Sequence, residues 1–199
     1  MGFKIRKSNL CQINLQTTKR FVGHSKEVLS VVFSPDNRQI LSAGCDREVR
    51  LWNTLADCKY VTDKNNHQDW VSCLRYSPLQ KAGKPSTFQP YFASVGWDGR
   101  LKIWNTNIQI RASFKAHDSY INALAISPNG RYIATGGKDR NLVIWDVTDL
   151  SKPANVFDAG CTINQISFNP KMQWVRSENF IFKGCRRHRT RSQSLGLES

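Results

Sequence analysis

The stretch HSKEVLSVVFSPDNRQILSAGCDREVRLWN, residues 24–53, decides the fold of this chain. It contains a histidine, a Ser-Pro pair ten residues later, then a hydroxyl residue, an aspartate, and a tryptophan six residues after the aspartate. The same order occurs three times, in the sets His24, Ser42, Asp46 and Trp52; His67, Ser94, Asp98 and Trp104; His117, Thr135, Asp139 and Trp145. Such a recurrence indicates an internal repeat in which each copy forms one supersecondary unit.

The length of the repeat indicates its type. Trp52 and Trp104 are 52 residues apart, and Trp104 and Trp145 are 41 apart. Nine of the eleven residues by which the spacings differ lie between Pro78 and Asp98. A period of about 40–45 residues that ends in Trp-Asp or Trp-Asn is typical of WD40 repeats, each of which forms a four-stranded propeller blade. We therefore expect an all-β fold, a partial WD40 β-propeller.

Apolar runs bounded by turn residues predict the strands of each blade. The expected strands are 28–33, 38–43, 48–53 and 58–62 in the first blade, 70–76, 91–96, 100–105 and 108–115 in the second, and 120–126, 131–136, 141–147 and 155–158 in the third. Residues 81–90 contain two prolines and a glycine, and we expect them to form an inserted loop.

The two ends of the chain depart from the repeat. Residues 17–22 are expected to form the outer strand of a preceding blade, and 161–168 the first strand of a following one. In that last repeat Ala159 occupies the histidine position, and neither Asp nor Trp follows Pro170 at the repeat spacing. The expected organisation is a basic N-terminal segment (1–16), a partial propeller (17–175) with three complete blades and incomplete blades at both ends, and a basic, disordered tail (176–199).

The recurring His, Ser or Thr, Asp and Trp are expected to form a buried hydrogen-bonded chain in each blade. Buried polar groups must be paired, or each costs about 1–3 kcal/mol. A Ser, His and Asp could instead form a nucleophilic triad, which would make the protein a hydrolase. Three equivalent active sites in one chain are improbable, and Ser42, Ser94 and Thr135 have no G-x-S-x-G motif around them. We therefore predict structural tetrads and no enzymatic activity.

Composition excludes several other classes of protein. None of the apolar runs approaches the ~18–20 residues of a membrane span, and the basic start leads into no apolar signal-peptide region. The six cysteines include no C-x-x-C pair, so no zinc site is expected. Unpaired cysteines indicate a reducing compartment, and we expect a cytoplasmic protein without metal or cofactor.

The net charge of +14 favours an acidic partner such as RNA or a phosphorylated surface. Part of this charge lies at the expected turn positions Arg47, Arg100, Lys138 and Arg140. These four residues are candidates for contact with a partner or with RNA. Alternatively they are solvated turn residues, since turns are usually exposed.

Several segments are similar to one WD40 family in detail. KEVLSVVFSPDNRQILSAGCDREVRLWNTLADCKY, WVSCLRYSP, SVGWDGRLKIWN, YINALAISPNGRYIATGGKDRNLVIWDV and TINQISFNPKMQWV resemble blades three to five and the start of blade six of the receptors for activated protein kinase C. The resemblance extends from residue 18 to about residue 175. It implies a seven-bladed Gβ-like family, of which this chain looks like a truncated member.

The resemblance implies a cytosolic scaffold of the small ribosomal subunit that brings kinases and other signalling proteins to translation. The family's contacts with ribosomal RNA come mainly from its first blade, which has no counterpart here, so the resemblance does not carry that contact over. Two alternatives remain open. One is a G-protein β-like subunit, although residues 1–19 show no heptad. The other is a fragmentary gene product without independent function.

Overall fold

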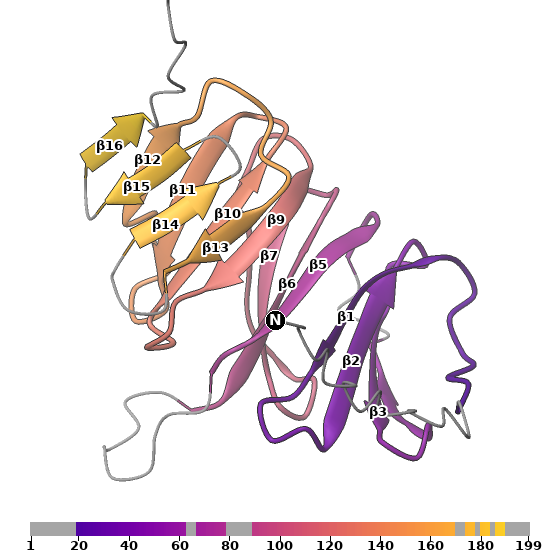
Figure 1. Ribbon diagram of the computed structural model, residues 1–199. Helices are drawn as coiled ribbons and strands as arrows, with labels where there is room; N and C mark the ends of the chain where they lie inside the picture. Colours follow the sequence, from indigo (N-terminus) through magenta and orange to yellow (C-terminus); the bar gives the residue numbers. More distant parts are fainter. Residues whose placement is uncertain are drawn as a thin grey trace, which may run out of the picture.

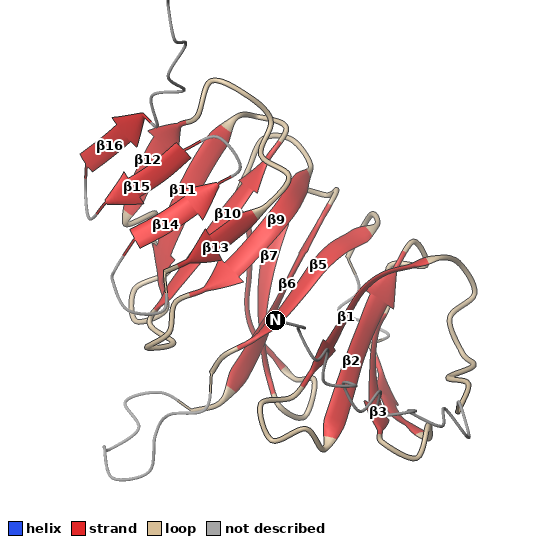
Figure 2. Cartoon of the chain, in the orientation of Figure 1, coloured by secondary structure: helices blue, strands red, loops and turns tan. Residues whose placement is uncertain are grey.

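The computed structural model describes residues 19–62, 67–78, 89–169, 174–177, 180–183 and 186–189. Regular structure in these ranges consists of β-strands, which form four antiparallel sheets of four strands each (Figure 2). The prediction of an all-β partial propeller is therefore confirmed. Within the same ranges no helix is long and apolar enough to cross a membrane.

Each sheet contains four strands that follow one another in the sequence. The first sheet contains β1 (Val28–Phe33), β2 (Gln39–Gly44), β3 (Val49–Asn53) and β4 (Cys58–Val61). The second contains β5 (Val71–Tyr76), β6 (Tyr91–Gly96), β7 (Arg100–Asn105) and β8 (Ile110–Lys115). The third contains β9 (Ile121–Ile126), β10 (Tyr132–Gly137), β11 (Asn141–Asp146) and β12 (Asn155–Asp158). The fourth contains β13 (Ile166–Phe168), β14 (Trp174–Ser177), β15 (Phe180–Lys183) and β16 (Arg186–Arg189).

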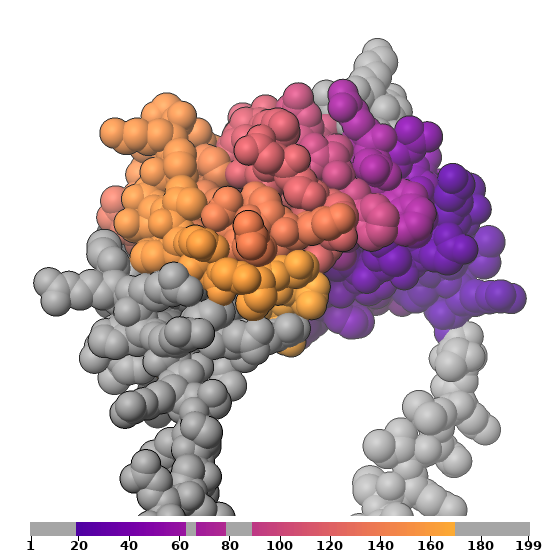
Figure 3. All heavy atoms as spheres, turned by 90° about the horizontal axis from the view of Figure 1, so that it is seen from above, coloured from indigo at the N-terminus to yellow at the C-terminus, as the bar shows by residue number. Residues whose placement is uncertain are grey.

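The sheets stand side by side in chain order, as blades do in a propeller. The first strand of each sheet lies beside the first strand of the next, so that β1 contacts β5, β5 contacts β9 and β9 contacts β13 (Figure 1). In the space-filling view the colours accordingly pass from indigo to orange across the molecule in the order of the sequence (Figure 3).

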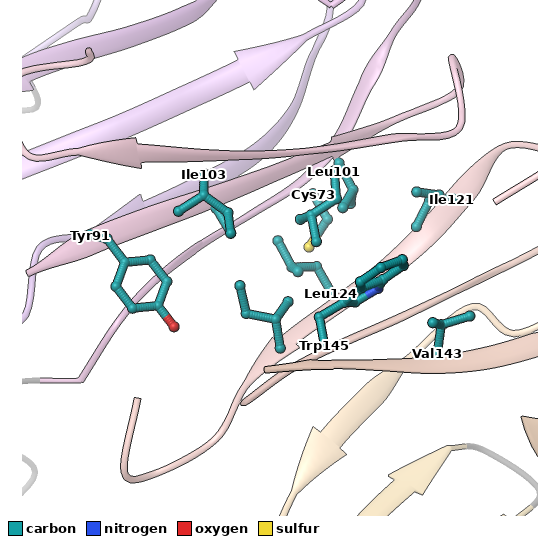
Figure 4. Close-up of a cluster of buried hydrophobic side chains, with 11 residues drawn as sticks. Cys73, Tyr91, Leu101, Ile103, Ile121, Leu124, Val143 and Trp145 are labelled. Carbon is teal, nitrogen blue, oxygen red and sulfur yellow. The ribbon is translucent and has the colours of Figure 1, made fainter. Parts of the chain in front are cut away.

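Apolar side chains fill the spaces between adjacent sheets. Between the second and third sheets the buried cluster includes Tyr91, Ile103, Leu124, Ile133 and Trp145 (Figure 4). Every residue of β6 is buried, because a middle strand is covered on both faces by neighbouring sheets. The outer strand β8 instead alternates between half-buried and exposed residues. Each fully buried large apolar side chain contributes about 1.5–3 kcal/mol, so the interfaces between sheets provide most of the stabilisation.

The serine of each Ser-Pro pair fixes the turn that follows the first strand. Its buried hydroxyl accepts a hydrogen bond from the backbone N–H that opens the second strand: Ser34 from Gln39 at 2.9 Å, Ser77 from Tyr91 at 3.0 Å, and Ser127 from Tyr132 at 2.8 Å. This repeated bond explains why a serine recurs at the end of each first strand.

The turn between the second and third strands requires a left-handed backbone. The residue after the tetrad aspartate has φ of 70° at Arg47, 70° at Gly99 and 68° at Arg140. At Gly99 a Cβ would lie 2.5 Å from the carbonyl oxygen of His117, so glycine is needed there for space as well as for conformation.

Two expectations at the chain ends are wrong. Residues 19–22, the described part of the expected N-terminal strand, form no strand. Residues 176–189 were expected to belong to a disordered tail, but their described parts contribute to β14, β15 and β16, which pair in sequence with β13. The apolar Phe180, Ile181 and Phe182 favour a strand without any Asp or Trp motif. The expected segments 1–16 and 190–199 and most of the expected loop 81–90 lie outside the described residues.

Candidate functional site

Two loops of each of the first three sheets meet at one end of the sheet and bring the predicted tetrad together. One loop precedes the first strand and carries the histidine, and the turn between the second and third strands carries the aspartate. In the second sheet the backbone N–H of Trp97 donates to the carbonyl oxygen of Trp70 at 2.9 Å, which joins the two loops. Ser94 on β6 and Trp104 on β7 lie beneath them.

The second tetrad is a continuous chain of hydrogen bonds. His67 Nδ1 lies 2.9 and 3.0 Å from the two carboxylate oxygens of Asp98. His67 Nε2 lies 2.8 Å from Ser94 Oγ, which also accepts from Trp104 Nε1 at 2.9 Å. The carboxylate also accepts from the backbone N–H groups of Gln68 at 2.9 Å and Arg100 at 3.0 Å. The chain therefore ties both loops to the body of the sheet.

The first and third tetrads have the same geometry. In the first, His24 lies 2.6 Å from both Asp46 and Ser42, and Trp52 donates to Ser42 at 2.7 Å. In the third, His117 lies 2.8 Å from both Asp139 and Thr135, and Trp145 donates to Thr135 at 3.1 Å. All twelve residues selected from the sequence thus come together in threefold repetition.

Protonation follows from burial and from these partners. Burial lowers the pKa of His67 below its ordinary value, and the hydrogen bond and charge of Asp98 oppose this shift without cancelling it. Burial also lowers the pKa of His117, against the charge and hydrogen bond of Asp139. Both rings are therefore neutral at pH 7. Because a carboxylate can only accept, the ring proton is assigned to Nδ1, and Nε2 accepts from the hydroxyl.

Asp98 stays ionised for a related reason. Burial by itself raises the pKa of its carboxyl, but the hydrogen bond from His67, together with those from the N–H groups of Gln68 and Arg100, outweighs burial. The net result is a pKa below the ordinary value. A buried carboxylate with several donors is stable as a charge without a cationic partner.

The hydroxyls of the tetrads are poorly placed for nucleophilic attack. Ser94 and Thr135 have no exposed surface, and Ser42 is 6% exposed. Each hydroxyl oxygen also accepts a hydrogen bond from an indole N–H. A nucleophile must reach its substrate while bonded to its base, and here each hydroxyl is buried and already bonded to both an imidazole and an indole. The arrangement therefore joins parts of the blade and does not present a reactive oxygen to solvent.

One group of side chains has the composition of a metal site. Ligand atoms of His24, Asp46 and Glu48 lie within 4.8 Å of one another. Both ring nitrogens of His24 are engaged by Asp46 and Ser42, and Glu48 pairs with Arg50 at 2.7 Å. The hydrogen bonds of the tetrad and this ion pair explain why the three side chains lie close together.

The four basic turn residues lie around the same end of the sheets but are not equivalent. Arg47, Lys138 and Arg140 are exposed, while Arg100 is half-buried. Arg47 Nη1 donates to the carbonyl oxygen of Gln68 in the next sheet at 3.4 Å. Lys138 Nζ lies 5.1 Å from the centre of the Tyr120 ring. Three cations are therefore available to a partner at this end.

Sequence reasoning missed an aromatic row beside the tetrads. Trp70 and Trp97 have ring centres 4.4 Å apart, and those of Trp97 and Tyr120 are 5.1 Å apart. Trp70 and Tyr120 each stand three residues after a tetrad histidine, and Trp97 directly precedes a tetrad aspartate. Their fixed offset from the repeat was the available signal, because all three stand in the loops that carry the tetrad histidines and aspartates.

Comparison with known proteins agrees with the repeat. A sequence model of the family described as WD domain, G-beta repeat matches residues 15–53, 58–105 and 108–146. The chain is 44% identical over 205 residues to small ribosomal subunit protein RACK1y of Oryza sativa subsp. japonica, covering 79% of this chain and 59% of that protein. It is 40% identical over 200 residues to small ribosomal subunit protein RACK1 of Drosophila melanogaster, covering 79% and 60%. The chain thus spans about three fifths of the length of these relatives.

Proposed function

Because the chain belongs to the WD40 family of G-beta repeat proteins, we propose that it is a non-enzymatic scaffold that links signalling proteins to the small ribosomal subunit. The observation that carries the proposal is the threefold tetrad, which makes each blade a rigid support for its loops. A rigid support that presents variable loops is suited to binding other macromolecules.

The similarity to two proteins named as small ribosomal subunit proteins supports the ribosome as a partner and the cytoplasm as the location. Kinases and other signalling proteins are proposed from the same family resemblance. No step in this function needs a cofactor, a metal or a membrane.

Arg47, Arg100, Lys138 and Arg140 are the residues we propose for a polyanion contact. The exposed Arg47, Lys138 and Arg140 take part in no ion pair within the described ranges. Contact with phosphate would release counterions from RNA, so binding that uses these cations should weaken steeply with salt. The half-buried Arg100 is the weakest of the four candidates.

The proposal is tested by co-sedimentation of the whole purified chain with small ribosomal subunits at two salt concentrations. The test variant carries Arg47→Glu and Arg140→Glu, and the matched control carries Lys59→Glu and Lys152→Glu, which reverse two exposed charges elsewhere. We expect the chain to sediment with the subunit, and the test variant to lose more binding than the control. Failure of the parent chain to sediment at low salt would contradict the proposal and favour the alternative of a product without independent function.

A further inference from the structure

A row of four side chains crosses the boundary between the second and third sheets. In each sheet the residue just before the first strand is joined to the residue just before the tetrad aspartate. The backbone N–H of Trp97 donates to the carbonyl oxygen of Trp70 at 2.9 Å, and the backbone N–H of Lys138 donates to that of Tyr120 at 3.1 Å. The two backbone pairs place Trp70, Trp97, Tyr120 and Lys138 in sequence, with ring-centre distances of 4.4 and 5.1 Å and the Lys138 ammonium 5.1 Å from the Tyr120 ring. These four residues form the aromatic row.

The aromatic row is not part of the hydrophobic core. Trp70 and Trp97 are each 38% exposed, and none of the three aromatic residues belongs to the buried clusters between the sheets. By contrast, the tetrad indoles of Trp52 and Trp104 are at most 2% exposed. Contiguous exposed aromatic surface on a soluble protein marks an interaction site more often than a structural need.

An exposed cation lies at each end of the aromatic row. Lys138 lies at one end, beside Tyr120. Arg47 lies at the other end, where it donates to the carbonyl oxygen of Gln68, two residues before Trp70. Four carboxylates adjoin the row in sequence. Asp98 and Asp139 are held in the tetrads, with side chains only 3% and 13% exposed. Asp69 accepts from the backbone N–H of Trp70 at 2.8 Å, and Asp118 pairs with Lys115 at 3.2 Å. The cations at the two ends therefore favour an anionic partner.

The packing of the rings decides which anionic partner fits. The Trp97 ring is stacked on Tyr120 and tilted by 31° against Trp70, and Lys138 lies over the ring of Tyr120. A nucleic-acid base needs a free ring face for stacking, and faces inside this row are already in contact with one another. Ring edges carry partial positive charge and attract carboxylate and carbonyl oxygens.

We propose that the aromatic row and Arg47 form a docking surface for a partner-protein segment in which carboxylates flank an apolar side chain or proline. The apolar group packs on the indoles, and the carboxylates face Lys138 and Arg47. This inference rests on the proposed scaffold function and deepens it, since it assigns one protein-binding surface and the chemistry of its ligand.

Three probes test the surface on the whole chain. The first is a pool of short acetylated peptides in which Asp or Glu residues flank one Pro, Leu or Phe. The second is the same pool with Asn and Gln in place of the acids, and the third is a short oligouridylate. Binding is followed by the indole N–H signals in NMR. Signals of Trp70 and Trp97 should move, whereas those of Trp52, Trp104 and Trp145 should not, because their N–H groups are bonded to buried hydroxyls.

Matched variants locate the contact. We expect Trp97→Ala to weaken binding of the acidic pool about tenfold or more, as removal of a central aromatic anchor does. Lys138→Glu should weaken it about fivefold or more, with the difference shrinking at high salt. Tyr60→Ala and Lys59→Glu on the exposed strand β4 should leave binding unchanged. Lys138→Glu keeps the test decisive if Trp97→Ala fails to fold.

The inference is overturned if the uncharged pool binds equally well, or if neither variant weakens the acidic pool. It is also overturned if oligouridylate binds through Trp97, or if no peptide binds at about 1 mM, the weakest affinity expected of a specific contact. Co-sedimentation with ribosomal subunits separates the two proposals. Peptide binding without co-sedimentation contradicts the ribosomal role alone, and co-sedimentation without peptide binding contradicts this surface alone.

Discussion

Replacement of Asp98 by alanine tests the structural role of the tetrads most directly. The Asp98 side chain is 3% exposed, and it accepts hydrogen bonds from His67 Nδ1 and from the backbone N–H groups of Gln68 and Arg100. Alanine leaves all three donors without their acceptor. Gln68 is exposed, so water can replace its lost bond. His67 has no exposed side-chain surface, so its ring N–H stays unpaired.

The unpaired ring N–H of His67 accounts for most of the expected loss in the free energy of unfolding. A buried donor left unsatisfied costs about 1–3 kcal/mol, and we expect Asp98→Ala to lower the free energy of unfolding by about that amount. Asp139 provides an internal scale, because its side chain is 13% exposed and it is bonded to His117 and to one backbone N–H, that of Asn141. Asp139→Ala should therefore cost less than Asp98→Ala.

Urea titration followed by far-UV circular dichroism measures the effect, provided that the slope of the transition is unchanged. The matched control is Asp118→Ala, which removes a carboxylate that is 97% exposed and should leave the midpoint where it is. The reasoning is refuted if Asp98→Ala is as stable as the parent chain. It is also refuted if Asp139→Ala is the more damaging of the two.

Three further predictions concern pH, turn geometry and association. The free energy of unfolding should fall as the pH drops below about 6.5. Histidines of the unfolded chain take up protons there, whereas folded His67 and His117, whose pKa values are lowered, do not. Urea titration should show the free energy of unfolding falling by at most about 1.4 kcal/mol per pH unit for each ring. Gly99→Ala should destabilise by about 1–3 kcal/mol through strain at positive φ, whereas Arg140→Gly at the same turn position should stabilise by about 0.5 kcal/mol in thermal melts. The chain should self-associate at micromolar concentration through exposed apolar residues of β1, and Val31→Lys, at a side chain 57% exposed, should reduce the association seen by light scattering.

Repetition made the tetrads and most of the strands predictable. A histidine at a fixed distance before Ser-Pro and an aspartate six residues before Trp place the same four groups in every copy of one backbone unit. Expected and observed strands in the first three sheets consequently agree to within two residues at their ends. The burial of Ser94 and Thr135 followed from the same repeat, since a hydroxyl between an imidazole and an indole leaves little room for solvent.

The fourth sheet was not predictable by the same route. Its strands contain no tetrad, and the repeat pattern ends near residue 175. Strands β14 to β16 pair in succession onto β13, and pairing depends on backbone hydrogen bonds that any non-proline residue can make. Residues 180–182 have a strand-forming preference, but they belong to no repeated motif that would place them in a blade.

By itself, the sequence determined what is local and repeated: the type of fold, the blade boundaries, the turn residues and the members of each tetrad. Tertiary structure alone decided what lies between repeats. Trp97 and Tyr120 are distant in the motif yet stack at 5.1 Å, because the turn before the third strand of one blade lies beside the loop before the first strand of the next. Arg47 reaches Gln68 for the same reason. A linear motif specifies contacts within one blade, whereas neighbouring surfaces depend on the angle and distance at which sheets pack, and those are set by the apolar side chains between them.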